Sequence, residues 1–157
     1  MSIPQKIYEE DHVIFRESVR RFIEQEIAPH HEQWEKDGIV PKALWLKAGE
    51  AGLLSPGVPE EYGGPGVDFR YNGIVDEEMS KAGFSGPGFS LHSDIAVPYL
   101  VHYGSEEQKR EYLPKCVSGE CIMAIAMTEP GTGSDLQGVK TTALLDGNEY
   151  VVNGSKT

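Results

Sequence analysis

Cysteine is scarce in this sequence, and no set of residues has the spacing of a metal site. Of 157 residues only Cys116 and Cys121 are cysteine, and neither has companions at zinc-site spacing. The five histidines do not assemble a site by spacing either. We therefore expect no bound metal, and two buried or half-buried thiols in a reducing compartment.

Basic residues are also few, and long apolar runs are absent. The chain has 14 Lys and Arg against 25 Asp and Glu, which gives a formal net charge of -11. This charge argues against nucleic acid and anionic membranes as partners, because both are bound through clustered Lys and Arg. No stretch of about 18 apolar residues occurs, so we expect no membrane insertion. Residues 1–11 are polar and acidic, unlike a secretory signal. The expectation is a soluble protein, cytoplasmic in a bacterium and in the mitochondrial matrix in a eukaryote.

Helical periodicity extends over most of the first 119 residues. Apolar residues recur at helical spacing and predict helices near residues 8–28, 31–36, 41–52, 69–82, 89–102 and 106–116. Pro29 stops or kinks the first helix, and Ser105 with Gln108 forms a capping box that opens the last. Gly119 is expected to end the helical part.

Two of these helices carry more specific expectations. In the helix of residues 69–82, Glu77, Glu78 and Lys81 are expected to be exposed. In the helix of residues 89–102, apolar side chains run nearly all round, which indicates burial against more than one neighbour. Between helices, residues 53–68 are rich in Gly and Pro and are expected to form a compact packed loop.

The pattern changes to strands after Gly119. Strands are predicted at residues 122–128, 139–145 and 149–153, with a hairpin turn at residues 146–148. The expected fold class is mostly α, with an N-terminal helical bundle domain (residues 1–119) followed by the first strands of an antiparallel β-domain (residues 120–157).

The loop after the first predicted strand is the best candidate for a ligand site. The apolar run 121–127 leads into Pro130, Gly131 and Gly133, and the loop carries the hydroxyls of Thr128, Thr132 and Ser134. Such a row of donors, with free backbone N–H groups, suits a phosphate or the polar rim of a ring. The spacing fits neither a Rossmann fingerprint nor a P-loop. A surface hairpin connection remains the alternative from spacing alone.

The same loop resembles a family signature. Residues 126–135, AMTEPGTGSD, are similar to the first signature of the acyl-CoA dehydrogenases, flavoenzymes that desaturate the α,β bond of acyl-CoA thioesters. Further segments match in order: PEEYGGPG (59–66), YGSEEQK (103–109) and VNGSK (152–156). The resemblance covers essentially the whole chain, and SGPGFSLHS (85–93) is most similar to the long-chain-specific branch.

The resemblance implies which residues bind the cofactor FAD. Thr128 corresponds to the family threonine that hydrogen-bonds the pyrimidine side of the flavin, and Ile125 and Met127 match residues that lie against the ring. Gly133 and Ser134 match positions near the pyrophosphate and the CoA arm. Thr132, where many relatives have alanine, is given no contact.

The resemblance also implies an acyl-chain wall on the helix of residues 89–102. Phe89, Ser93, Ala96 and Val97 are expected to face the acyl chain, together with Ser134 as a substrate-binding residue of the loop. A central core helix that touches no ligand is the alternative. His92 and Asp94 are expected to be polar positions along that wall or simply exposed.

Family members are well over twice this length, so the resemblance implies that the chain is an N-terminal fragment. The catalytic glutamate and a C-terminal helical domain are expected to lie beyond residue 157, which would leave the fragment inactive and without catalytic residues of its own. The whole protein is expected to be an FAD-dependent dehydrogenase of fatty acid β-oxidation. It would act on acyl-CoA, pass electrons to an electron-transferring flavoprotein, and form a homo-oligomer, a tetramer.

Two other functions stay open at this point. One is a non-catalytic helical interaction module, which would be colourless because it holds no flavin. The other is an acyl-CoA oxidase or flavin monooxygenase on the same scaffold, which the reaction of the reduced flavin with oxygen would distinguish from a dehydrogenase.

Overall fold

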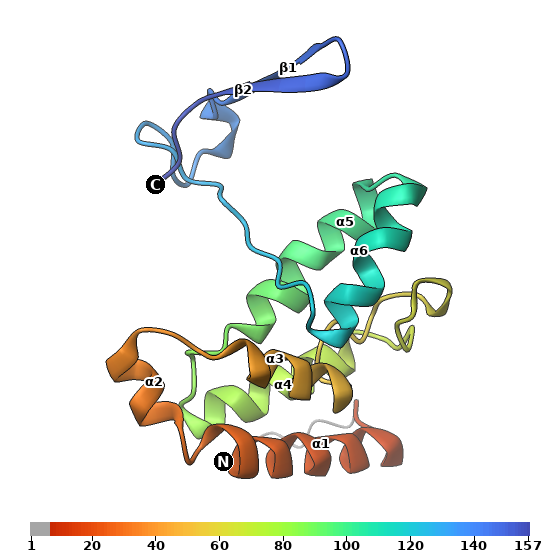
Figure 1. Ribbon diagram of the computed structural model, residues 1–157. Helices are drawn as coiled ribbons and strands as arrows, with labels where there is room; N and C mark the ends of the chain where they lie inside the picture. Colours follow the sequence, from red (N-terminus) through yellow and green to blue (C-terminus); the bar gives the residue numbers. More distant parts are fainter. Residues whose placement is uncertain (1–6) are drawn as a thin grey trace. The chain divides into compact units, whose positions relative to one another are not determined.

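A computed structural model describes residues 7–157, which divide after Met123 into two compact units. We call residues 7–123 the helical unit and residues 124–157 the terminal unit. The helical unit contains α1 (Glu10–Phe22), the π-helical η1 (Ile23–Ile27), α2 (His31–Asp37), α3 (Lys42–Glu50), the short 3-10 helix η2 (Glu60–Tyr62), α4 (Arg70–Ala82), the π-helical η3 (Leu91–Ala96), α5 (Val97–Tyr103) and α6 (Glu106–Ser118) (Figure 1). The terminal unit contains the 3-10 helix η4 (Leu136–Gly138) and the strands β1 (Thr142–Asp146) and β2 (Glu149–Asn153). The mostly α fold with a short antiparallel sheet, predicted from the sequence, is confirmed.

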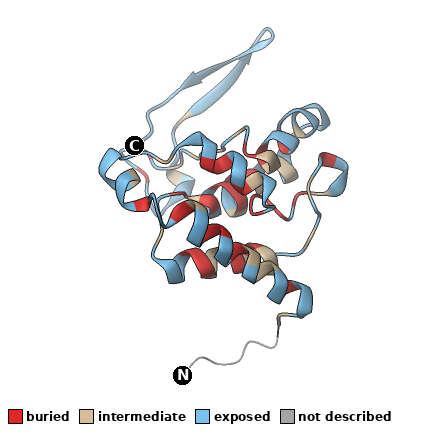
Figure 2. Cartoon of the chain, turned by 60° about the horizontal axis from the view of Figure 1, so that its bottom comes forward, coloured by how far each residue is buried: buried red, intermediate tan, exposed pale blue. Residues whose placement is uncertain are grey.

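Two apolar clusters form the core of the helical unit. The larger joins α1, η1, α3, α4 and the start of the next helix, with Val19, Ile27, Ala48 and Ile74 fully buried. The smaller joins η2, α5 and α6 through Val58, Tyr62, Val97, Leu113 and Cys116. Figure 2 shows buried residues along the inner faces of these helices. The helical spacing read from the sequence thus produces the core.

The ends of the helices follow local sequence signals. Ser105 accepts a hydrogen bond from the backbone N–H of Gln108, and the Gln108 side chain bonds back to the Ser105 backbone, which confirms the predicted capping box. At the other end of α6, Gly119 adopts a left-handed conformation with φ 79°. Cys116 is buried, Cys121 is partly buried and both are free thiols, as expected.

One expectation for α4 is wrong. Glu78 is buried, with an exposed fraction of 5%. Its carboxylate accepts hydrogen bonds from Arg20 of α1, at 2.7 Å from Nε, and from Arg16, whose Nη1 also bonds Glu77 at 2.7 Å. Because α1 and α4 pack together, arginines of α1 meet the glutamates of α4. An acidic residue on the buried side is stable when it is paired in this way.

A second correction concerns the helix that runs through η3 and α5. Its apolar residues are not buried all round, because Leu91, Ile95 and Tyr99 are 41%, 45% and 52% exposed. These three residues are four apart and line one face, whereas Phe89 and Ala96 are buried. Among residues 7–123 of the helical unit, no element buries this face.

The first predicted strand is the third correction. Residues 122–128 have no strand pairing, although the side chains alternate between partly buried and exposed. In the described part of the chain this extended segment has no partner strand, and a strand exists only through pairing. The predicted hairpin is present: β1 and β2 pair antiparallel with Thr142 opposite Asn153 and Asp146 opposite Glu149. Both strands are exposed throughout.

Among residues 7–157, no helix combines the length and the hydropathy that crossing a membrane requires.

Candidate functional site

The glycine-rich loop of the terminal unit is closed by its own backbone. The N–H of Glu129 donates to the carbonyl of Thr132 at 2.9 Å, and the N–H of Thr132 donates back to Glu129 at 3.0 Å. Pro130 and Gly131 form the turn between them. The Thr132 hydroxyl donates to the carbonyl of Gly138 at 2.8 Å, so it faces inward and is already satisfied. The loop is therefore closed by hydrogen bonds between its own residues.

The carboxylate of Glu129 is the centre of this loop. It accepts the backbone N–H of Lys140 at 2.8 Å, the backbone N–H of Thr141 at 2.9 Å and the Lys156 ammonium at 3.0 Å. Hydrogen bonds from Thr141 and Lys140 lower the pKa of Glu129 to about 2. Glu129 is thus an ionised, nearly buried anchor that joins three separated segments of the terminal unit.

Sequence reasoning missed this role of Glu129. The available signal was that Glu129 is the only charged residue between residues 121 and 134. A charge kept within an apolar and glycine-rich stretch requires partners. Lys156, the principal charged partner, is 27 residues away along the chain, and spacing alone does not reveal such a pair.

The same contacts hold the backbone of the expected flavin residues. Lys156 donates to the carbonyl of Met127 at 3.1 Å, and the N–H of Thr157 donates to the carbonyl of Thr128 at 3.0 Å. Thr128, Gly133 and Ser134 are exposed, and Ile125 and Met127 are partly buried. The loop can therefore present the hydroxyls of Thr128 and Ser134 to a ligand from a fixed backbone.

The expected acyl-wall residues lie in the helical unit and face its core. The Phe89 ring packs edge-on against Trp45 with centroids 5.0 Å apart, and the Ser93 hydroxyl accepts the N–H of Ser55 at 2.9 Å. Ala96 and Val97 are buried. His92, expected on the wall or exposed, is fully buried, which excludes the exposed alternative.

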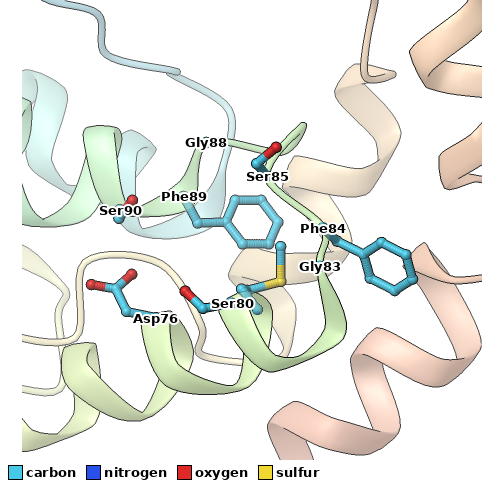
Figure 3. A pocket seen from close by; sticks show the side chains of 9 residues that line it. Asp76, Ser80, Gly83, Phe84, Ser85, Gly88, Phe89 and Ser90 are labelled. Carbon is cyan, nitrogen blue, oxygen red and sulfur yellow. The ribbon is translucent and has the colours of Figure 1, made fainter.

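Beside Phe89 lies a cavity of about 540 Å³. It is bounded by the end of α4, the segment of residues 83–88 and the start of the following helix, and its lining includes Phe84, Phe89, Asp76, Ser80 and Ser85. Figure 3 shows Asp76 and Ser80 on α4, across from Ser90 and Phe89. Burial and the neighbouring carboxyl of Asp94 raise the pKa of Asp76 to about 7. The cavity wall therefore combines apolar side chains, such as Phe84 and Phe89, with the polar side chains of Asp76, Ser80 and Ser85.

One group in the described residues has the composition of a metal site, namely Glu9, Asp11 and His12 at the start of α1. The Nδ1 atom of His12 already accepts the N–H of Glu9 at 3.2 Å as part of the helix cap. Since that lone pair is used, we assign no metal to this group.

Comparison with known proteins agrees with these features. Residues 9–120 match the family model of the acyl-CoA dehydrogenase N-terminal domain, and residues 124–157 match the model of its middle domain. The long-chain specific mitochondrial acyl-CoA dehydrogenase of Sus scrofa is 53% identical over 97% of this chain.

Solved structures of acyl-CoA dehydrogenases are also similar to this chain in fold. An acyl-CoA dehydrogenase from Geobacillus kaustophilus superimposes on 97% of this chain with a TM-score of 0.91 and 53% identity, and this chain covers 40% of it. An acyl-CoA dehydrogenase from Bacillus anthracis, solved with FAD, gives a TM-score of 0.88 at 39% identity over 98% of this chain and 27% of its own length.

The chain spans about a third of the length of the curated relatives it matches, 35% for the porcine protein. With both family models matched in order over nearly all of residues 9–157, the chain belongs to the acyl-CoA dehydrogenase family.

Proposed function

We propose that the protein containing this chain is an FAD-dependent dehydrogenase that desaturates the α,β bond of long-chain acyl-CoA in fatty acid β-oxidation. The observation that carries this proposal is the loop anchored by Glu129, which holds the backbone of Thr128 while leaving its side chain exposed. FAD supplies the acceptor for the hydride that leaves the β-carbon.

The terminal unit is proposed to hold the flavin. The Thr128 hydroxyl would donate to the pyrimidine side of the ring, where negative charge grows on reduction. Ile125 and Met127 would lie against the ring, with Gly133 near the pyrophosphate and Ser134 near both the pyrophosphate and the CoA arm. A Cβ atom built at Gly131 or Gly133 meets no atom within 4 Å, so the backbone there is open to a ligand.

The helical unit is proposed to contribute to binding the acyl chain. Phe89, Ser93, Ala96 and Val97 are the residues that the family resemblance selects, and Phe89 also lines the cavity beside α4. The exposed face of Leu91, Ile95 and Tyr99 on the same helix offers a second apolar wall. The preference for a long acyl chain is proposed from the resemblance of residues 85–93 to the long-chain-specific branch and from the identity with long-chain specific relatives.

The remaining parts of the proposal follow from the family. The residues 1–119 and 120–157 are proposed as the N-terminal helical domain and the start of the middle β-domain. The base that removes the α-proton is proposed to lie outside these residues. An electron-transferring flavoprotein is the proposed acceptor, a tetramer the proposed assembly, and the cytoplasm or mitochondrial matrix the proposed location, according to the organism.

The test uses the complete reading frame that encodes these residues. The purified protein is expected to be yellow and to reduce an electron-acceptor dye in the presence of C12 to C18 acyl-CoA. Thr128→Val should weaken FAD binding about tenfold, since one hydrogen bond to the flavin ring is lost. The matched control Thr142→Val, on exposed β1, should leave it unchanged. A colourless protein that takes up no added FAD would refute the proposal and favour the helical interaction module.

The runner-up is an oxidase or monooxygenase of the same family. Its reduced flavin would react rapidly with oxygen, and stopped-flow reoxidation in air therefore distinguishes the two. Slow reoxidation together with fast transfer to an electron-transferring flavoprotein is the result expected here.

A further inference from the structure

The ring of His92 is enclosed in the helical unit and has no assigned role in binding. It lies on η3 with an exposed fraction of 0%, and it packs edge-on against Trp45 of α3 with ring centroids 5.4 Å apart. A fully buried imidazole with an unpaired nitrogen would be costly, so its hydrogen bonds determine what it does.

Both ring nitrogens are paired, and their partners fix the tautomer. The Nδ1 atom accepts the backbone N–H of Met123 at 3.0 Å. The Nε2 atom lies 3.1 Å from the carbonyl oxygen of Cys116. A backbone N–H only donates and a carbonyl only accepts, so the single proton of the neutral ring belongs on Nε2.

The surroundings keep this ring neutral. Burial lowers the pKa of His92, although the Cys116 carbonyl and the negative charge of Asp94 act in the opposite direction. Trp45 of α3 brings no charge, and the Cys116 thiol of α6 has its own pKa raised to about 12 by burial and by Cys121. A second proton on Nδ1 would point at the Met123 N–H and break that bond.

The two bonds of His92 join places that are distant in sequence. Cys116 is in the last turn of α6, where its carbonyl also accepts the N–H of Gly119 at 3.4 Å, and Met123 is the last residue of the helical unit. Between them the chain reverses at Gly119, and the N–H of Cys121 donates to the carbonyl of Lys115 at 2.9 Å. Beyond Met123 the chain passes directly to Ile125, Met127 and Thr128.

We propose that His92 is a positioning residue: its neutral ring, with the proton on Nε2, holds Met123 against the end of α6 and so fixes the point from which the flavin-binding segment starts. The consequence for FAD rests on the function proposed above. The tautomer and the hydrogen bond to Met123 do not depend on it.

The first test is side-chain ¹⁵N NMR of the 157-residue chain, with the His92 resonances assigned from a His92→Gln variant. A neutral ring with the proton on Nε2 is expected throughout pH 6 to 8. A ring with the proton on Nδ1, or one that is half protonated near pH 6.5, would overturn the proposal.

The second test separates the two bonds of the ring. In His92→Asn, the side-chain oxygen occupies the place of Nδ1 and can still accept the Met123 N–H, whereas the contact with Cys116 is lost. In His92→Gln, the side-chain amide reaches toward Cys116 and the acceptor for Met123 is lost. Hydrogen exchange of the Met123 amide should be about tenfold faster in His92→Gln, which loses the acceptor, and about threefold faster in His92→Asn, which keeps the acceptor but loses the bond to Cys116. His102→Gln, an exposed histidine on the same helix, is the control.

A ring that only fills space gives a different result. Both variants would then loosen Met123 equally, and that outcome would overturn the proposal. Helical content from circular dichroism shows that each variant is folded.

The last test measures FAD affinity in the complete protein. His92→Gln should weaken FAD binding about tenfold and His92→Asn about threefold, while His102→Gln should stay within about twofold of the wild type. Unchanged FAD affinity in a His92→Gln protein with a loosened Met123 would overturn the positioning role and leave the proposed function intact. A wild-type protein that binds no FAD would refute the proposed function, and with it the consequence of His92 for FAD, while the NMR result would still stand.

Discussion

Glu78 shows how a single side chain links two helices of the helical unit. Its carboxylate is 5% exposed and receives Arg16 and Arg20 of α1, with side chains 13% and 52% exposed. Hydrogen bonds from these arginines and Lys81 outweigh burial and lower the pKa of Glu78 to about 2. Because this value is below the ordinary one, the stability from Glu78 is present above pH 4.5 and is lost as the pH falls toward 2.

Replacing this charge should destabilise the helical unit. Glu78→Gln removes one of the two carboxylates that pair with the partly buried Arg16 and leaves only Glu77, so we expect a loss of about 2 kcal/mol in the free energy of unfolding at pH 7. The value is below that of a fully buried pair because Arg20 is half exposed. Urea unfolding at pH 7 measures the loss. Glu32→Gln, from an exposed pair with Lys36, is the control and should change stability by less than about 0.5 kcal/mol. Equal effects of the two substitutions would contradict the assignment.

Asp76 should show the opposite pH dependence. Its pKa is raised to about 7 by burial and by Asp94, so its contribution to stability is present below pH 3.8 and is lost as the pH rises through 7. Asp76→Asn cannot ionise and still donates a hydrogen bond to Asp94. The variant should be more stable than wild type by about 2 kcal/mol at pH 8, with no difference near pH 4. Thermal unfolding across this range measures the gain, and Asp37→Asn, at an exposed carboxylate, should show none. A constant gain at all pH values would show that ionisation of Asp76 is not the cause.

Glu129 provides the residue-scale prediction for the candidate site. An amide in Glu129→Gln retains one acceptor oxygen, whereas the carboxylate uses both oxygens for Lys140, Thr141 and Lys156. At least one of the backbone amides of Lys140 and Thr141, which bond different oxygens of Glu129, should therefore exchange hydrogen about tenfold faster. NMR hydrogen exchange measures this, with Glu120→Gln, an exposed residue, as the control. Unchanged protection of both amides would show that the carboxylate does not anchor the loop.

Helix ends give a prediction at the scale of elements. Gly38 after α2 and Gly119 after α6 both adopt left-handed conformations, with φ of 69° and 79°. A Cβ atom at Gly38 would meet nothing within 4 Å, whereas at Gly119 it would clash with the Trp45 carbonyl of α3. Gly38→Ala should cost about 1 kcal/mol, from backbone strain alone. Gly119→Ala should cost at least about 3 kcal/mol, because α6 must also separate from α3. Chemical denaturation compares the two, and similar losses would mean that the close approach to Trp45 is unimportant.

The same elements show what could be predicted from sequence. Helix ends marked by local signals, such as the Ser105 capping box and Gly119, were predicted correctly because their causes lie within a few residues. Burial of Glu78 depends on arginines 58 and 62 positions away, and no local pattern contains that pairing. The π-helical segments η1 and η3 were not predicted, since their apolar spacing differs little from that of an α-helix.

The position of the candidate site could be predicted from the sequence, but the contacts that hold its backbone in place could not. The hydroxyls and glycines of residues 128–135 identified the loop, and the family signature gave its expected ligand. The anchoring by Glu129 and Lys156 and the enclosure of His92 required the folded chain, because each joins residues more than 20 positions apart.

At the scale of the whole chain, the two units differ in how far the side chains of their helices and strands are buried. The helical unit has two buried clusters, whereas every residue of β1 and β2 is exposed and, among the described residues, these strands pair only with each other. An isolated two-stranded hairpin is marginally stable in water. Large apolar residues on it, including Leu144, Leu145 and Tyr150, are 64%, 65% and 68% exposed. The unit should therefore open far more readily than the helices.

Hydrogen exchange of the 157-residue chain should show this difference directly. Amides of residues 142–153 are expected to exchange at least about a hundredfold faster than the core amides of α1 and α4, because opening the hairpin exposes little apolar surface that was buried. Mass spectrometry of exchanged peptides measures both regions in one sample, which controls for solution conditions. Equal protection would contradict the expectation, since it would require that the hairpin unfold only together with the helical core. A chain truncated after Met123 should keep the unfolding midpoint of the helical unit within about 2 °C, because both buried clusters remain complete in it.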